Sequence, residues 1–273
     1  MHNRRVTTAL SALTEMPDPK FVMVGDGYRV ATYCWEEDDE DGPTVVLVHG
    51  FASSTRDNWV NTGWVRDLRR AGFRVLALDQ RGHGHSDKPH LPSAYDLRAL
   101  AGDVETVLDT YLADEAFYIG YSLGARVGWE VASDFGERIP RVVLGGVPDG
   151  VPLARLNREQ AREYCEHGTP VTDPVTQNYI TLAERVGGND LLALLSIADA
   201  MATAGAADPD PADAPDQPIL FATGSQDAIL EGSKALAAGI PNGRFVEIPD
   251  RNHFNTPGSR DFRSAALAFL TEE

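Results

Sequence analysis

Five residues near the middle of the chain, Gly120 to Gly124, place a serine between two glycines. This Gly-Tyr-Ser-Leu-Gly pentad follows an apolar run, Ala116–Ile119, and precedes a helix-compatible segment, Leu123–Phe135. A strand that turns sharply into a helix lifts the serine hydroxyl clear of the sheet, and side chains two residues before and after it would collide with neighbouring backbone. The pattern predicts a nucleophile elbow at Ser122. Alone it is weak, because an ordinary strand–turn–helix junction fits the same residues.

Strands and helices alternate along most of the chain. Phe21–Val24 and Tyr28–Trp35 flank Gly25-Asp26-Gly27 and predict a hairpin. Continuous apolar runs have the composition of strands covered on both faces, and segments with apolar residues at helical spacing lie between them. The predicted strands are 44–48, 73–78, 116–119, 141–146, 219–223 and 244–248, and the predicted helices include 59–70, 97–112, 123–135 and 262–270. This alternation predicts an α/β fold with a mostly parallel sheet and helices on both faces.

The alternation stops after the strand pattern at 141–146. Between about residues 149 and 203, helical patterns at 155–166, 179–186 and 191–201 follow one another without a strand. A segment rich in Ala, Asp and Pro, residues 205–218, then leads back to the next strand pattern. We therefore predict an α/β core made of residues 1–148 and 218–273, and an inserted helical cap with its linker, residues 149–217.

Two later residues could act together with Ser122. Asp227 follows the predicted strand 219–223, and His253 follows the predicted strand 244–248. Because the carboxyl ends of parallel strands meet at one edge of a sheet, these side chains and Ser122 should emerge together. A serine hydroxyl is a poor nucleophile until a neutral imidazole takes its proton. A carboxylate on the far ring nitrogen fixes the tautomer and stabilises the imidazolium, so the three residue types predict nucleophilic catalysis.

Two backbone N–H groups are candidates for stabilising an oxyanion. The N–H of Leu123 follows the serine at the start of a predicted helix. The N–H of Phe51 lies just past the end of the predicted strand 44–48, in the sequence His49-Gly50-Phe51.

Taken together, these motifs resemble the α/β-hydrolase superfamily. The resemblance covers the chain from about residue 21 to its end, apart from the insertion, and rests on His49-Gly50-Phe51, the loop Asp79 to Asp87, the pentad around Ser122, Gly224-Ser225-Gln226-Asp227 and Asn252-His253-Phe254. It implies an eight-stranded sheet with a helical cap inserted after the sixth strand. It also implies catalytic roles: a nucleophile, Ser122; a base, His253; its orienting acid, Asp227; and the oxyanion-hole donors, Phe51 and Leu123.

Several of these roles have competitors. Asp149 follows the sixth predicted strand, and some superfamily members take the acid from that place. His83 and His85 lie in a loop that the superfamily uses structurally, and we expect His49 to orient its own loop by hydrogen bonding. A group of apolar and aromatic side chains could line an acyl pocket or simply pack in the core: Trp59, Trp64, Tyr121, Tyr164, Tyr179, Leu192, Met201 and Phe254.

Charge and hydropathy limit the partners of the chain. Its formal net charge is −17, which argues against nucleic acid or an anionic membrane as a partner. The first twenty residues lack the apolar core of a signal peptide, and no apolar run approaches membrane-spanning length. We therefore expect a cytoplasmic protein with a small-molecule substrate. No group of His, Cys, Asp and Glu has metal-ligand spacing, so we expect no metal and no cofactor. The sequence leaves the oligomeric state open.

These observations favour a serine hydrolase that cleaves a carboxylic ester or lactone through an acyl-enzyme. Epoxide hydrolases and haloalkane dehalogenases use an aspartate nucleophile, and position 122 is a serine. The acidic surface would not steer an anion, which favours a small neutral or apolar substrate. Alternatives with the same triad are a C–C hydrolase acting on a ring-fission dienoate, an amidase and a cofactor-free perhydrolase. The first often needs an arginine for a substrate carboxylate, and Arg126 is a candidate of open orientation. A remaining alternative is a non-catalytic ligand-binding member of the fold.

Overall fold

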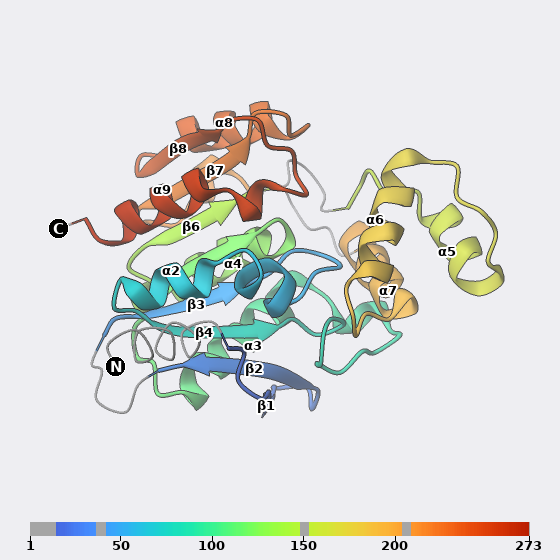
Figure 1. Ribbon diagram of the computed structural model, residues 1–273, viewed down its shortest axis with the longest axis horizontal. Helices are drawn as coiled ribbons and strands as arrows, with labels where there is room; N and C mark the ends of the chain where they lie inside the picture. The colour runs from blue at the N-terminus through green and yellow to red at the C-terminus, as the bar shows by residue number, and fades with distance from the viewer. Residues whose placement is uncertain (1–14, 37–41, 148–152, 204–208, 273) are drawn as a thin grey trace, which may run out of the picture.

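The computed structural model describes residues 15–36, 42–147, 153–203 and 209–272. At its centre is one eight-stranded sheet with the order β1-β2-β4-β3-β5-β6-β7-β8 (Figure 1). Strand β2 runs antiparallel to both of its neighbours, and all other neighbouring strands are parallel. The strands are β1 (Lys20–Met23), β2 (Arg29–Trp35), β3 (Thr44–Val48), β4 (Arg74–Asp79), β5 (Phe117–Tyr121), β6 (Val142–Gly145), β7 (Ile219–Gly224) and β8 (Gly243–Ile248). The predicted fold class is confirmed, including the hairpin that begins the sheet.

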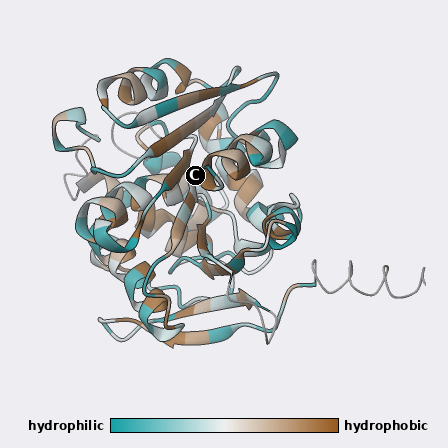
Figure 2. Cartoon of the chain, turned by 90° about the vertical axis from the view of Figure 1, so that its left-hand side faces the viewer, coloured by the Kyte–Doolittle hydropathy of each residue, from teal (hydrophilic) through white to brown (hydrophobic). Residues whose placement is uncertain are grey.

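The central strands are apolar on both sides because helices cover both faces of the sheet. In β3, Val46 and Val48 join the core cluster that contains the buried sides of α3 and α4, whereas Val45 and Leu47 join the cluster that contains α2 and α9. Figure 2 shows the apolar strands running through the middle of the molecule between helices that turn their polar sides outward. The helices on the first face are α3 (Leu97–Thr110), α4 (Leu123–Asp134) and α8 (Leu230–Gly239), and those on the second are α2 (Trp64–Arg70) and α9 (Arg260–Leu270).

Three further helices lie at the end of the sheet toward which the parallel strands point (Figure 1): α5 (Arg158–His167), α6 (Pro174–Arg185) and α7 (Leu191–Thr203). They have a small apolar cluster of their own, which includes Leu156 and Leu195. Asn189 ties them to the core, since its Nδ2 donates to the carbonyl of Ala52 at 2.8 Å. The predicted boundary at 148 and 149 lies outside the described residues, so the division into core and cap stays a prediction.

Two of the predicted helices differ from the structure. The predicted helix 59–70 is wrong in its first half: residues Arg56–Val60 form a turn of π-helix, and α2 begins only at Trp64. Gly63 separates the two with a left-handed φ of 87°. Helix α6 begins at Pro174, earlier than the predicted 179–186, because Asp173 caps it by accepting from the N–H of Thr176. In the described residues, no helix is long and apolar enough to cross a membrane.

Candidate active site

Ser122 sits on the sharp turn between β5 and α4. Its φ of 53° is in the left-handed region, and its side chain is nearly buried. The turn explains the glycines on either side. A Cβ at Gly120 would lie 2.3 Å from the carbonyl oxygen of Gly124, and a Cβ at Gly124 would lie 2.1 Å from the carbonyl oxygen of Val48. Neither position can accept a side chain without moving backbone, as the pentad predicts.

The structure joins Ser122, His253 and Asp227 in one hydrogen-bonded chain. His253 Nε2 lies 2.9 Å from Ser122 Oγ, and His253 Nδ1 lies 2.8 Å from Asp227 Oδ2. The second carboxylate oxygen of Asp227 accepts from the N–H of Ile229 at 3.2 Å. The carboxylate is 3% exposed and the imidazole 20% exposed, so the acid is shielded while the base can meet a substrate. Asp149, the alternative acid, lies outside the described residues.

The loops that carry Asp227 and His253 are bound to each other at the ends of β7 and β8. The N–H of Gln226 donates to the carbonyl of Arg251 at 2.8 Å. A Cβ at Gly224 would lie 2.2 Å from that same carbonyl oxygen, so only glycine permits the approach. The hydroxyl of Tyr121 donates to the carbonyl of His253 at 2.5 Å. The histidine is therefore held by its side chain and by its own backbone.

Both predicted oxyanion donors lie beside Ser122. Leu123 is the first residue of α4, where an N–H has no acceptor within the helix. Phe51 follows Gly50, whose missing side chain allows the chain after β3 to approach the end of β5: a Cβ at Gly50 would lie 3.3 Å from Ser122 Cβ. The N–H of Gly50 donates to Asn58 Oδ1 at 3.1 Å, which fixes the peptide just before Phe51. Phe51 and Ser122 line the same cavity, and the N–H groups of Phe51 and Leu123 stay the predicted oxyanion donors.

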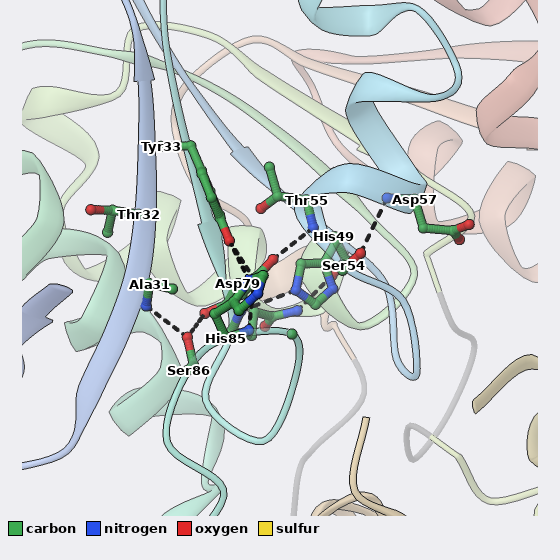
Figure 3. Close-up of polar contacts among 12 residues, drawn as sticks. Ala31, Thr32, Tyr33, His49, Ser54, Thr55, Asp57, Asp79, His85 and Ser86 are labelled. Carbon is green, nitrogen blue, oxygen red and sulfur yellow. Dashed lines mark hydrogen bonds and ion pairs between the residues drawn. The ribbon is translucent and has the colours of Figure 1, made fainter. Parts of the chain in front are cut away.

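A buried polar cluster around Asp79 binds the turn that follows Phe51 through Thr55 (Figure 3). Asp79, at the end of β4, accepts from the N–H of Thr55 at 2.8 Å, from the hydroxyl of Tyr33 at 3.0 Å and from the N–H of His85 at 3.0 Å. Burial opposes ionisation of the Asp79 carboxyl, but the electrostatic interaction with His49 and these three hydrogen bonds lower its pKa. Sequence reasoning gave Asp79 no separate role, although it ends a strand as Asp227 follows one.

The other two histidines near the pentad are backbone braces. His49 Nε2 accepts from the N–H of Gln80 at 3.0 Å, and its Nδ1 lies 2.8 Å from the Gly50 carbonyl. His83 Nε2 accepts from the N–H of Ala52 at 3.0 Å. Burial lowers the pKa of His49, and it lowers the pKa of His83 to about 3. Both rings are neutral at pH 7, as the expected loop-orienting role of His49 requires.

Ser122 and His253 line a cavity of about 410 Å³. Its aromatic side combines Phe51, Tyr179 from α6 and Phe254, whose ring centroids lie 5.6 Å and 5.7 Å apart in succession. Burial raises the pKa of Tyr179, so its hydroxyl stays protonated. Polar side chains from the turn that follows Phe51 and from the loop around His253 also line the cavity: Ser53, Asp57, Asn58, Asn61, Thr62, Arg251 and Asn255. Leu182 and Arg185 of α6, Tyr121 and Pro257 add to this lining.

Several candidate pocket residues lie outside the cavity. Arg126 is buried beside Glu130, at 3.4 Å, and does not line the cavity. Among the candidate lining residues, Tyr121, Tyr179 and Phe254 reach the cavity, Trp59, Trp64 and Met201 are core residues, and Leu192 and Tyr164 lie outside it. In the described part of the chain, no group of three His, Cys, Asp or Glu side chains could hold a metal ion.

Part of the chain is similar in sequence to a known family and to curated proteins. A family model described as alpha/beta hydrolase fold matches residues 43–164. "Epoxide hydrolase B" of Mycobacterium tuberculosis is 41% identical over 122 residues, which cover 45% of this chain and 33% of that protein. The match thus spans about a third of this curated relative's length.

Solved structures match over most of the chain. The enol-lactonase from Burkholderia xenovorans LB400 has a TM-score of 0.73 and 24% identity, and the alignment covers 93% of this chain and 100% of that one. The esterase from Thermogutta terrifontis has a TM-score of 0.73 and 22% identity, with 93% and 98% covered. At these identities the likeness shows a shared fold.

Proposed function

Residues 43–164 match the alpha/beta hydrolase family model and the chain shares its fold with solved hydrolases, and from this premise we propose that it is a serine hydrolase of the α/β-hydrolase fold that cleaves a carboxylic ester or lactone of a small substrate. The observation that carries the proposal is the hydrogen-bonded chain from Asp227 through His253 to Ser122, at the wall of a cavity of about 410 Å³. A cavity of this size suits a small substrate.

The proposed reaction is acyl transfer in two steps. His253 Nε2 takes the proton of Ser122 as Oγ attacks the carbonyl carbon, while Asp227 stabilises the imidazolium through Nδ1. The N–H groups of Phe51 and Leu123 receive the oxyanion. His253 then gives the proton to the departing alkoxide, which leaves an ester on Ser122. A water molecule that His253 deprotonates then attacks this ester, and His253 returns that proton to Ser122 Oγ as the bond to the acyl group breaks and the acid is released.

The curated relative's name raises the question of epoxide opening, and the chemistry of residue 122 argues against it. A carboxylate that opens an epoxide forms an ester, which water can cleave. A serine hydroxyl that opened an epoxide would form an ether, which the same site has no means to hydrolyse. A serine at the elbow therefore fits an acyl substrate, whose intermediate is an ester.

A fluorophosphonate probe tests the proposal directly. We expect it to add its mass to Ser122 of the wild type, because phosphonylation needs the activated hydroxyl. Ser122→Ala should take up no label, and His253→Ala should label at least about 1,000-fold more slowly. Circular dichroism of both variants checks that the fold is kept. An unlabelled wild-type protein would refute serine catalysis.

A substrate panel then tests the reaction type. p-Nitrophenyl esters of increasing chain length, lactones and a ring-fission dienoate should be compared by kcat/KM. Turnover of esters or lactones supports the proposal. Turnover of the dienoate alone would replace it with C–C bond hydrolysis. The acidic surface predicts a small neutral or apolar substrate, because it would not steer an anion that approaches from solvent. The p-nitrophenyl esters and the lactones of the panel are such substrates.

A further inference from the structure

We propose that Arg251, Asn58 and Asn255 bind a carboxylate of the substrate that is separate from the ester or lactone bond to be cleaved. The inference rests on the proposed function, because these side chains line the same cavity as Ser122 and His253. The proposed substrate carries an anionic group, a class of substrate that the acidic surface alone does not favour.

Arg251 is the charged member of this group. It follows β8, two residues before His253, and it is half-buried at the cavity wall. Its carbonyl accepts from Gln226, so its backbone is fixed beside the loop of Asp227. Among the described residues, its guanidinium forms no ion pair, although the chain carries 41 acidic residues against 24 basic ones. An arginine left without a carboxylate at a cavity wall is suited to binding one.

The two asparagines also offer donors. Asn58 is 4% exposed; its Oδ1 is taken by the N–H of Gly50, and its Nδ2 is buried with no partner in the described chain. The Oδ1 of Asn255 accepts from the N–H of Asn252 at 2.8 Å. In both residues the backbone occupies the acceptor and leaves the amide N–H groups for a ligand. Because a buried donor without an acceptor is costly, the Nδ2 of Asn58 favours a neighbouring group that only accepts hydrogen bonds, whereas Asn255 is exposed and its amide is open to a ligand.

The carboxylate that lines the cavity is already matched. Asp57 Oδ2 lies 3.4 Å from Arg185 and accepts from the hydroxyl of Ser53 at 3.1 Å. Asp227 is turned to His253 and is not part of the lining. Asp57 thus offsets the charge of Arg185, which also lines the cavity, and the guanidinium of Arg251 is left for a substrate to neutralise. Repulsion by the acidic surface acts over distance and is screened by salt, whereas these donors act on contact.

Two matched pairs of esters test the inference. Monomethyl glutarate differs from methyl valerate by a carboxylate in place of a methyl group on the acyl side, and 4-acetoxybutanoate differs from butyl acetate in the same way on the alcohol side. Acid release is followed at constant pH. We expect kcat/KM to favour the carboxylate-bearing member of at least one pair by about 10- to 100-fold, as a charge-assisted hydrogen bond would give.

Variants of Arg251 assign the preference. Arg251→Gln should lower that ratio by about 10- to 100-fold, mainly through KM, and Arg251→Lys should keep part of it because the charge remains. Arg260→Gln, at an exposed position outside the cavity lining, is the matched control and should leave the ratio unchanged. Glutarate should slow fluorophosphonate labelling of the wild type and lose this effect in Arg251→Gln.

The outcomes separate this inference from the proposed function. A wild-type protein that labels at Ser122, shows no protection by glutarate and does not favour the acid of either pair overturns the carboxylate site and leaves the serine hydrolase intact. A ratio that Arg251→Gln does not change also overturns it. A protein that neither labels nor cleaves any ester overturns the proposed function itself.

Discussion

Two histidine sites lie within one edge of the sheet and differ in what their ring nitrogens contact. His253 has a side chain at each end of its ring, Asp227 at Nδ1 and Ser122 at Nε2. His49 and His83 have backbone groups at both ends and are completely buried. A ring between a carboxylate and a hydroxyl can move a proton, whereas a ring between N–H and carbonyl groups can only hold them in place. Position at a strand end therefore does not identify a base; its partners do.

Among the variants that test this difference between the histidine sites, we expect the largest effect at Asp227. Asp227→Asn keeps the shape of the side chain but can donate to Nδ1, which turns the imidazole into the wrong tautomer. We expect kcat to fall by about 10⁴-fold, measured on the best ester of the panel. A near-wild-type rate would move the acid to Asp149, the alternative that the sequence leaves open.

The catalytic residues at the edge of the sheet could be predicted because the direction of the strands determines where they lie. Parallel strands bring their carboxyl ends together, so Ser122, Asp227 and His253 could be placed side by side from strand patterns alone. The role of the pentad glycines could also be predicted, because glycine is needed where another stretch of backbone approaches too closely for a side chain.

The cavity wall was not predictable in the same way. Asn58 and Asn255 become donors only because particular backbone N–H groups occupy their acceptors, and no residue pattern records that. Arg126 was a candidate from its place on α4, but the structure puts Arg251 in the cavity lining instead. The start of α6 was readable, since Asp173 before Pro174 is a helix-start signal that the apolar periodicity overlooked.

The next effect concerns stability and comes from the bracing histidines. Burial lowers the pKa of His83 to about 3, so the folded protein leaves it neutral while the unfolded chain protonates it near pH 6.5. Its contribution to stability is thus complete above pH 6.5 and falls as the pH drops toward 3. Between pH 7 and pH 5 we expect His83 to cost the fold about 2 kcal/mol.

Urea unfolding at these two pH values measures that loss. His83→Gln, which can still accept from Ala52, should lose less stability on acidification than the wild type. His167→Gln, at a side chain that is 62% exposed, is the matched control and should behave as the wild type does. An equal loss in His83→Gln and the wild type would contradict a brace that stays neutral.

The smallest effect is expected at Tyr121, which holds His253 through its backbone. Tyr121→Phe removes the hydroxyl that donates to the His253 carbonyl at 2.5 Å and leaves that carbonyl without its partner. We expect kcat to fall about 5- to 10-fold with KM unchanged, since about 1 kcal/mol of positioning is lost where the proton moves. Tyr95→Phe removes a similar hydrogen bond, to Pro89 at 2.7 Å, and should lower stability without changing kcat. If both variants lost stability alike and kept kcat, the backbone anchor of His253 would be structural only, and its side-chain partners would account for the whole difference between the two histidine sites.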